Sequence, residues 1–188
     1  MGYIRIKNIG FGVILVTAKE PLLYKYLPVS QADKNWGLWA TGCGFASINK
    51  GDQYPPIGHP INYQLKWDTG RRLQEFQLLY ITKGQGVFES EHTALCEIKK
   101  GALIFLFPDV WHRYKPHSHI GWDEYWVGFN GEIIQKLMAN KFISPLQPTF
   151  NIGLDEKILE KYINLNLFLN EEPIGFNQLA SAEIFGIL

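Results

Sequence analysis

The stretch LFPDVWHRYKPHSHIGWDEYW, residues 106–126, concentrates side chains that are sparse elsewhere in the chain. It holds three of the five histidines and three of the six tryptophans of the 188 residues, together with a single glutamate, Glu124. This composition fits three interpretations: a metal site, a sugar pocket or an aromatic core. The pattern of the residues around the stretch indicates which kind of fold contains it.

The chain around this stretch has the pattern of a β-sandwich or barrel. Between residues 36 and 129, short apolar runs are separated by turn residues, and no helical periodicity is present. Turns are predicted at 68–70, 83–86, 91–93 and 99–101, and in all of them except 91–93 a glycine supplies the positive φ that the turn needs. The predicted strands are 39–48, 61–67, 76–82, 87–90, 94–98, 103–107, 112–115 and 122–129.

The pattern becomes helical after Asn130. Asn130 is predicted to cap a helix ending near residue 140, with apolar residues 133, 137 and 138 on one face. A second helix is predicted after Asp155 and a third over 175–188. The third ends in the apolar sequence IFGIL, 184–188, which indicates either a truncated chain or a helix that needs a partner.

Composition argues against several functions. The formal net charge is zero and the Lys and Arg residues are scattered, so the chain alone is not expected to bind DNA. Two cysteines, Cys43 and Cys96, are too few for a disulfide framework and suit a reducing cytoplasm. No apolar run reaches the roughly eighteen residues that span a bilayer, so no membrane contact is expected.

The N-terminal segment allows two interpretations. Arg5 and Lys7 precede an apolar run, 9–16, in an arrangement that imitates a secretory signal. Gly10, Gly12 and the shortness of the run favour a β-strand instead.

Two glycine spacings test the metal interpretation. Double-sheet barrels of the cupin kind end their second motif in a metal-binding histidine, and Gly101 and His112 lie at the separation of that motif. In the first motif, the positions of two histidines and a glutamate fall on Arg71, Leu73 and Gln77. Arginine stays protonated, leucine has no donor atom and a glutamine amide is a poor metal ligand. We therefore expect neither a bound metal nor a cofactor.

A second histidine pair lies nearby. His117 and His119 would suit zinc if they were in a strand, but Pro116, Ser118 and Gly121 predict the tip of a hairpin. A solvated loop is therefore predicted.

Strand alternation predicts which side chains share the barrel interior, because residues two apart lie on one face. The resulting face mixes aromatic plates with polar groups, which suits a small polyhydroxylated ligand. The candidate ligand-binding residues are Arg71, Gln77, Lys83, His112, Tyr114, Trp122, Glu124 and Trp126.

The same residues have a purely structural interpretation. The two tryptophans can be plain core, and Glu124 can form a buried ion pair with Arg71 or Lys83. Because an unpaired buried charge is costly, we expect a cation, a ligand or water beside Glu124.

Five segments together resemble the N-terminal regulatory domain of the AraC family of bacterial transcription regulators, over residues from about 24 onward. They are 36–42 (WGLWATG), 54–60 (YPPIGHP), 70–86 (GRRLQEFQLLYITKGQG), 111–114 (WHRY) and 121–131 (GWDEYWVGFNG).

This resemblance implies a mainly β, cupin-like jelly-roll barrel that binds an effector, usually a sugar, followed by two or three helices that form a homodimer. It implies a cytoplasmic sensor, not an enzyme, whose DNA contacts belong to a separate helix-turn-helix domain. The expected division is an N-terminal extension with a strand (1–23), the effector-binding barrel (24–130) and a helical dimerisation segment (131–188).

The sugar contacts of the family's namesake fall on Lys83, Tyr114 and Trp126, and its histidine contact falls on Glu124. Because Glu124 replaces a histidine and Lys83 an arginine, the resemblance implies a carbohydrate or another polar metabolite instead of arabinose. Two other functions stay open: a cupin isomerase or dioxygenase using His112 and Glu124 as acid and base, and a freestanding carbohydrate-binding module.

Overall fold

The computed structural model describes residues 22–56, 60 and 63–188. The predicted strand near the N-terminus, 9–16, therefore lies outside the described residues. Within them, the elements follow the order β1 (Leu22–Tyr26), α1 (Gln31–Asn35), β2 (Trp39–Ile48), β3 (Phe76–Ser90), β4 (Thr93–Lys99), β5 (Ala102–Leu106), β6 (His112–Pro116), β7 (Trp122–Asn130), α2 (Glu132–Ala139), β8 (Thr149–Asn151), α3 (Glu156–Glu171) and α4 (Phe176–Ile187).

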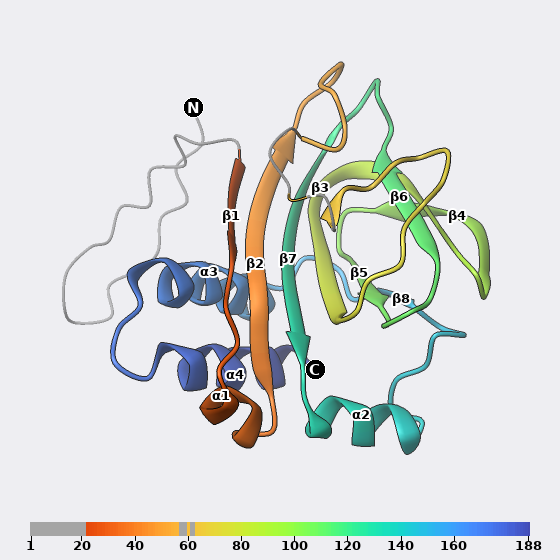
Figure 1. Ribbon diagram of the computed structural model, residues 1–188. Helices are drawn as coiled ribbons and strands as arrows, with labels where there is room; N and C mark the ends of the chain where they lie inside the picture. The colour runs from red at the N-terminus through yellow and green to blue at the C-terminus, as the bar shows by residue number, and fades with distance from the viewer. Residues whose placement is uncertain (1–21, 57–59, 61–62) are drawn as a thin grey trace.

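Two antiparallel sheets share the long strand β3. Its first half lies in a sheet of order β1-β2-β7-β3-β5-β8, and its second half pairs with β4 and β6 in the other sheet. The strand therefore bends from one sheet into the other and closes a barrel (Figure 1). This confirms the predicted double-sheet barrel followed by helices.

Alternation along the strands separates two cores. On β7, Trp122 and Trp126 belong to the cluster inside the barrel, whereas Tyr125, Val127 and Phe129 belong to a second cluster outside it. Both faces of this sheet are apolar because both are covered, which is why the strand sequences contain long hydrophobic runs.

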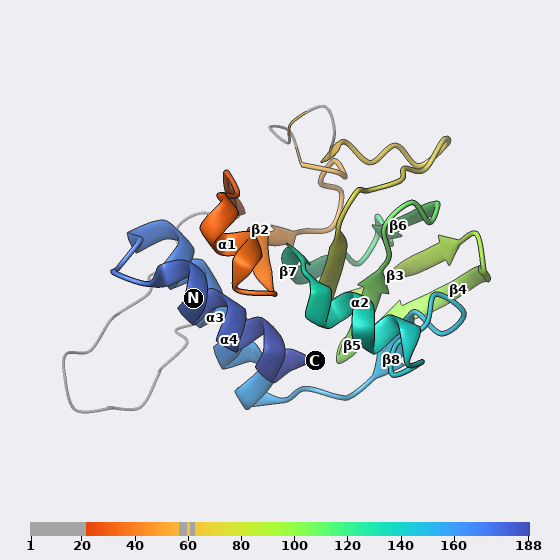
Figure 2. The same cartoon turned by 60° about the horizontal axis from the view of Figure 1, so that its bottom comes forward.

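Helices α3 and α4 cover the outer face of the large sheet. Figure 2 shows the two helices side by side, and they contact β2, with α3 also reaching β7 and β1. Helix α3 begins directly after Asp155, as the sequence predicted, and Asp155 caps it by accepting hydrogen bonds from the backbone of Lys157 and Ile158. In the last segment, Ile184 and Ile187 are buried against the sheet, so much of its apolar surface is used within the chain.

Several local predictions are wrong. Residues 63–67, the described part of predicted strand 61–67, do not form a strand, and 83–86 is not a turn because β3 runs through it. Asn130 belongs to β7, and Gly131 occupies the N-cap of α2 without a side-chain hydrogen bond. The short elements β1, α1 and β8 were not predicted.

In the described part of the chain, the helices are too short or too polar to cross a lipid bilayer.

Candidate functional site

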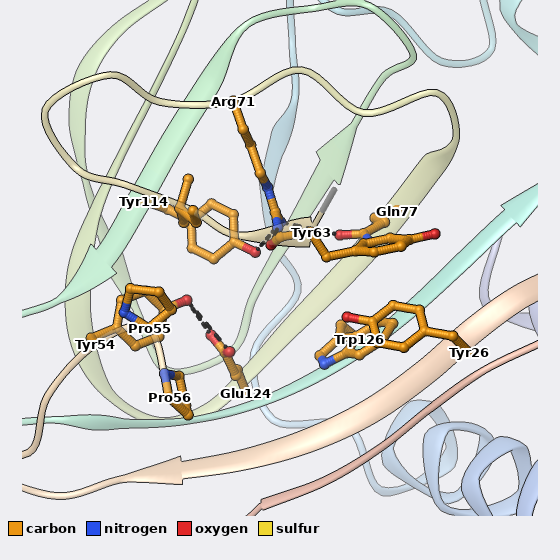
Figure 3. Close-up of a pocket in the computed structure, with 11 residues that line it drawn as sticks. Tyr26, Tyr54, Pro55, Pro56, Tyr63, Arg71, Gln77, Tyr114, Glu124 and Trp126 are labelled. Carbon is orange, nitrogen blue, oxygen red and sulfur yellow. Dashed lines mark hydrogen bonds between the residues drawn. The ribbon is translucent and has the colours of Figure 1, made fainter. Parts of the chain in front are cut away.

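One end of the barrel contains a small polar cavity of about 30 Å³. Its walls come from segments that are far apart in the sequence: β1, the segment 54–56, the segment before β3, and strands β3, β6 and β7 (Figure 3). The lining residues are Tyr26, Tyr54, Pro55, Pro56, Tyr63, Leu65, Arg71, Gln77, Tyr114, Glu124 and Trp126.

Arg71 is the central cation of this cavity. Its backbone exchanges two hydrogen bonds of 3.0 Å with His112, which fixes its position at the edge of the barrel. The guanidinium donates from Nη2 to the Tyr114 hydroxyl at 2.8 Å and to Gln77 Oε1 at 3.5 Å. It also donates to the backbone carbonyl of Tyr63. These acceptors are all neutral, so they orient the charge without neutralising it.

The guanidinium contacts His112 and Gln77, two of the residues whose spacing in the sequence was compared with the cupin metal motifs. Arg71 Nε donates to His112 Nε2 at 3.2 Å, while His112 Nδ1 lies 3.0 Å from the carbonyl oxygen of Val110. Burial and the charge of Arg71 lower the pKa of His112 to about 3, so the imidazole stays neutral. Leu73 packs in the apolar interior.

This arrangement does not fit a metal ion. The described residues include no group of three or more His, Cys, Asp or Glu side chains suited to hold one. The Nε2 atom of His112, which a metal would need, already accepts a hydrogen bond from a permanent cation. His117 lies in a loop and pairs with Glu97 at 2.9 Å.

Glu124 lies on the opposite side of the cavity from Arg71. The Tyr54 hydroxyl donates to its two carboxylate oxygens, at 3.1 Å and 3.4 Å. Burial raises the pKa of Glu124 to about 7, and the hydrogen bond from Tyr54 and the charge of Arg71 oppose that rise only in part. Among the described residues, no Lys, Arg or His nitrogen lies within 4.0 Å of the Glu124 carboxylate, the limit for an ion pair.

Four tyrosines give the cavity neutral hydroxyl groups. Burial raises the pKa of Tyr26, Tyr54 and Tyr63 well above the usual range and that of Tyr114 to about 12. Their rings also contact one another and Trp126; Tyr26 lies 4.2 Å from Tyr63 and 5.6 Å from Trp126 between ring centroids. The cavity thus combines aromatic faces with hydroxyls that remain protonated at neutral pH.

A second carboxylate lies behind the lining residues. Glu75 is 6% exposed and accepts hydrogen bonds from Gln77 Nε2 at 2.9 Å and from the Tyr63 hydroxyl at 3.1 Å. It thereby fixes two residues that do line the cavity.

The structure brings most of the sequence-predicted residues together. Arg71, Gln77, Tyr114, Glu124 and Trp126 line the cavity. His112 and Trp122 are buried behind it, the first on Arg71 and the second against the rings of Tyr54 and Tyr114.

Lys83 is exposed and does not line the cavity. A bulge in β3 between Ile81 and Lys83 shifts the alternation, so Ile81 lies opposite Glu124 whereas Lys83 lies opposite Asp123 on the other face. The inward orientation expected for Lys83 is therefore not observed.

Sequence reasoning missed Tyr26, Tyr54 and Tyr63. Tyr54 opens the YPPIGHP segment, so its place in a recognisable segment was an available signal. Tyr26 and Tyr63 had none, because their positions at the cavity depend on strand pairing and loop paths that no local pattern encodes.

Comparison with known protein families identifies the family to which this chain belongs. The family described as the AraC-like ligand binding domain matches residues 54–171, which is more than half of the sequence. The chain belongs to this family, and its fold is the cupin-like barrel with C-terminal helices that the sequence predicted. No curated protein sequence matches the chain significantly.

Solved structures with similarity to this chain include three proteins of low identity. Protein YhaK from Escherichia coli is 9% identical with a TM-score of 0.45, over 71% of this chain and 51% of that one, so the chain spans about half its length. A cupin 2 conserved barrel domain protein from Salinispora arenicola is 13% identical with a TM-score of 0.36, over 63% and 84%. An RmlC-like cupin from Methanocaldococcus jannaschii is 14% identical with a TM-score of 0.39, over 72% and 99%.

Proposed function

We propose that this chain is the effector-sensing and dimerisation domain of a cytoplasmic AraC-type transcription regulator, and that it binds a small polar ligand, a sugar or a close relative, without a metal. The observation that carries the proposal is the convergence of Arg71, Gln77, Glu124 and several tyrosine hydroxyls on one aromatic cavity. Charged and amide groups satisfy ligand hydroxyls, while Trp126 offers an apolar face to the ring.

The size of the cavity implies that binding is coupled to movement of its walls. About 30 Å³ accommodates roughly two water molecules, which is far less than a sugar needs. The Tyr54 hydroxyl now makes with Glu124 the kind of hydrogen bond that a ligand hydroxyl would make. A ligand that replaces this contact would displace Tyr54 and so change the rim of the barrel.

In the full regulator, this change would be transmitted to DNA through the helical segment. We propose the homodimer contact on α3 and α4, where Phe185 and Leu188 remain exposed one helical turn apart. DNA binding would belong to a separate domain, and linkage between ligand and DNA typically amounts to about 1–3 kcal/mol.

Binding is favoured over catalysis by the separation of the candidate acid and base. His112 is hydrogen-bonded to Arg71 and Val110, whereas Glu124 is hydrogen-bonded to Tyr54. A pair that performs proton transfer must lie within hydrogen-bond reach of one reacting group. A freestanding carbohydrate-binding module would use the same cavity and would differ only in lacking a DNA-binding partner domain.

A thermal-shift screen of sugars and related polar metabolites tests the proposal. A ligand present at about 100 times its Kd stabilises the folded protein by about 2.7 kcal/mol, which raises Tm measurably. Arg71→Met is expected to abolish the shift, and Lys83→Ala, which removes a cation outside the cavity, is expected to retain it. Equal shifts in both variants would place the ligand elsewhere, and no shift with any compound would contradict the sensor function.

A further inference from the structure

The charges inside this end of the barrel do not balance. The described residues place three ionisable groups there that can carry charge near neutral pH: Arg71 and Glu124, which line the cavity, and Glu75 directly behind it. His112 is neutral, and the tyrosine hydroxyls stay protonated. One cation faces two carboxylates, so one negative charge is left over when both carboxylates are ionised.

The surplus charge belongs to Glu124. Both oxygens of Glu75 accept hydrogen bonds from side chains, and Glu75 does not reach the cavity. Glu124 does reach it, and the bonds from Tyr54 occupy only part of the roughly four acceptor positions of a carboxylate. An incoming ligand therefore meets Glu124 as the available acceptor.

Aromatic rings surround the position that a ligand atom would take beside Glu124. Tyr54, Tyr114 and Trp126 all line the cavity with Glu124, and the ring centroids of Tyr54 and Tyr114 are 6.3 Å apart (Figure 3). A carboxylate among aromatic faces attracts an ammonium group by direct charge and by the negative potential of the ring faces. It repels an anion. The cation Arg71, which donates to the Tyr114 hydroxyl, lies on the other side of the cavity, where it suits hydroxyl oxygens (Figure 3).

We propose that the effector carries a protonated amine next to its hydroxyl groups, as an amino sugar does, and that Glu124 binds this amine. The inference rests on the proposed function and names the ligand class of the same cavity. An ammonium group neutralises the surplus charge on binding, whereas a neutral sugar leaves the buried Glu124 carboxylate without a direct ion-pair partner.

Matched pairs of sugars that differ in one substituent test the inference. Calorimetric titration of the full chain at about pH 7.4, where much of Glu124 is ionised and the amine is still largely protonated, would compare glucosamine with glucose, galactosamine with galactose, and mannosamine with mannose, with N-acetylated and uronic-acid forms as neutral and anionic controls. In at least one pair the amine is expected to bind at least about tenfold more tightly than its neutral partner. The uronic acids are expected not to bind.

Two variants assign the effect to its residue. Glu124→Gln keeps the shape of the side chain and removes its charge, so the amine and its neutral partner should bind with similar affinity. Lys83→Ala should preserve the preference. If a neutral sugar binds as tightly as its amine, or if Glu124→Gln keeps the preference, the amine inference is wrong while the sensor function stands. If no ligand of any class binds, the sensor function fails too.

Discussion

Arg71 and Glu124 show how single residues set the chemistry of this barrel. The guanidinium of Arg71 is held by His112, Gln77 and Tyr114, so a permanent cation lies at the centre of these residues. Glu124 is buried across the cavity with a hydroxyl for a partner. Of the cation, ligand or water expected beside it, the described residues supply no direct ion-pair partner, although the charge of Arg71 lowers the pKa of Glu124.

Glu124 should make the free energy of unfolding depend on pH. The folded protein keeps this proton up to about pH 7, whereas an unfolded glutamate releases it near pH 4.5, so the stability due to this group falls as pH rises between these values. The difference corresponds to about 3 kcal/mol at pH 8. Glu124→Gln should therefore be more stable than the wild type at pH 8, by up to that amount, and the advantage should shrink toward pH 5.

Urea unfolding at pH 5, 6.5 and 8 measures this difference. The lowered pKa of His112 has the opposite effect, because stability from that group is lost as pH falls from about 6.5 toward 3. His112 is present in both proteins, so it cancels when the variant is compared with the wild type. If the difference in the free energy of unfolding between Glu124→Gln and the wild type does not change with pH, the pKa of Glu124 is not raised in the folded protein.

Restoring the missing ligands should create a metal site. Arg71→His, Leu73→His and Gln77→Glu together would supply two histidines and a glutamate beside His112, whose Nε2 would then be free. The triple variant is expected to retain about one equivalent of zinc or nickel after dialysis, as measured by elemental analysis. The single variant Leu73→His, which leaves Arg71 in place, is the control. A folded triple variant that holds no metal would show that the match to the cupin positions is only approximate.

At the scale of elements, β3 decides how the site is built. It continues through residues that have the sequence pattern of a turn, and its bulge turns Lys83 away from the cavity. Gly84 permits this path because its φ is 79° and it lies against the backbone of Trp122, the first residue of β7, and of Gly121, which precedes β7. A Cβ there would come within 2.0 Å of the Gly121 carbonyl oxygen.

Gly84→Ala should therefore destabilise the fold more than a matched variant does. Gly51 has a similar φ of 85°, but a Cβ at that position would meet nothing within 4 Å. Both alanines incur the cost of a positive φ, and only Gly84→Ala adds the steric clash, for about 1–3 kcal/mol more. Chemical denaturation of the two variants measures the difference. Equal losses of stability in the two variants would mean that the backbone around Gly84 and Gly121 moves to accept the added Cβ without strain.

At the scale of the whole molecule, the barrel and the helices share one sheet. The face of β7 that carries Glu124 and Trp126 points to the cavity, and the opposite face, with Tyr125 and Val127, packs in the core that includes α3. A ligand that shifts β7 would therefore also move the support of the helices. This gives the proposed sensor a direct mechanical connection between effector and dimer contact.

The proposed dimer leads to a prediction about association. Light scattering is expected to give the mass of a dimer at micromolar concentration, and Phe185→Glu is expected to shift it toward the monomer. Phe185 is 56% exposed, so a charge there should not disrupt folding. Phe142→Glu, at a residue 77% exposed beyond α2, provides the control and should leave the dimer intact. If the wild-type chain is a monomer at every concentration measured, the predicted dimer contact on α3 and α4 is wrong for this chain.

The sequence by itself determined the double-sheet barrel and most of the strand segments from β2 to β7, because these depend on short-range spacing and on alternation within one strand. It also predicted that Arg71, Gln77, Tyr114, Glu124 and Trp126 share an interior. Only the tertiary structure decided that Lys83 lies outside, that Tyr26, Tyr54 and Tyr63 complete the cavity, and that Ile184 is buried. A bulge changes the phase of a strand, and chain crossings bring distant residues together, so neither is encoded in a local pattern.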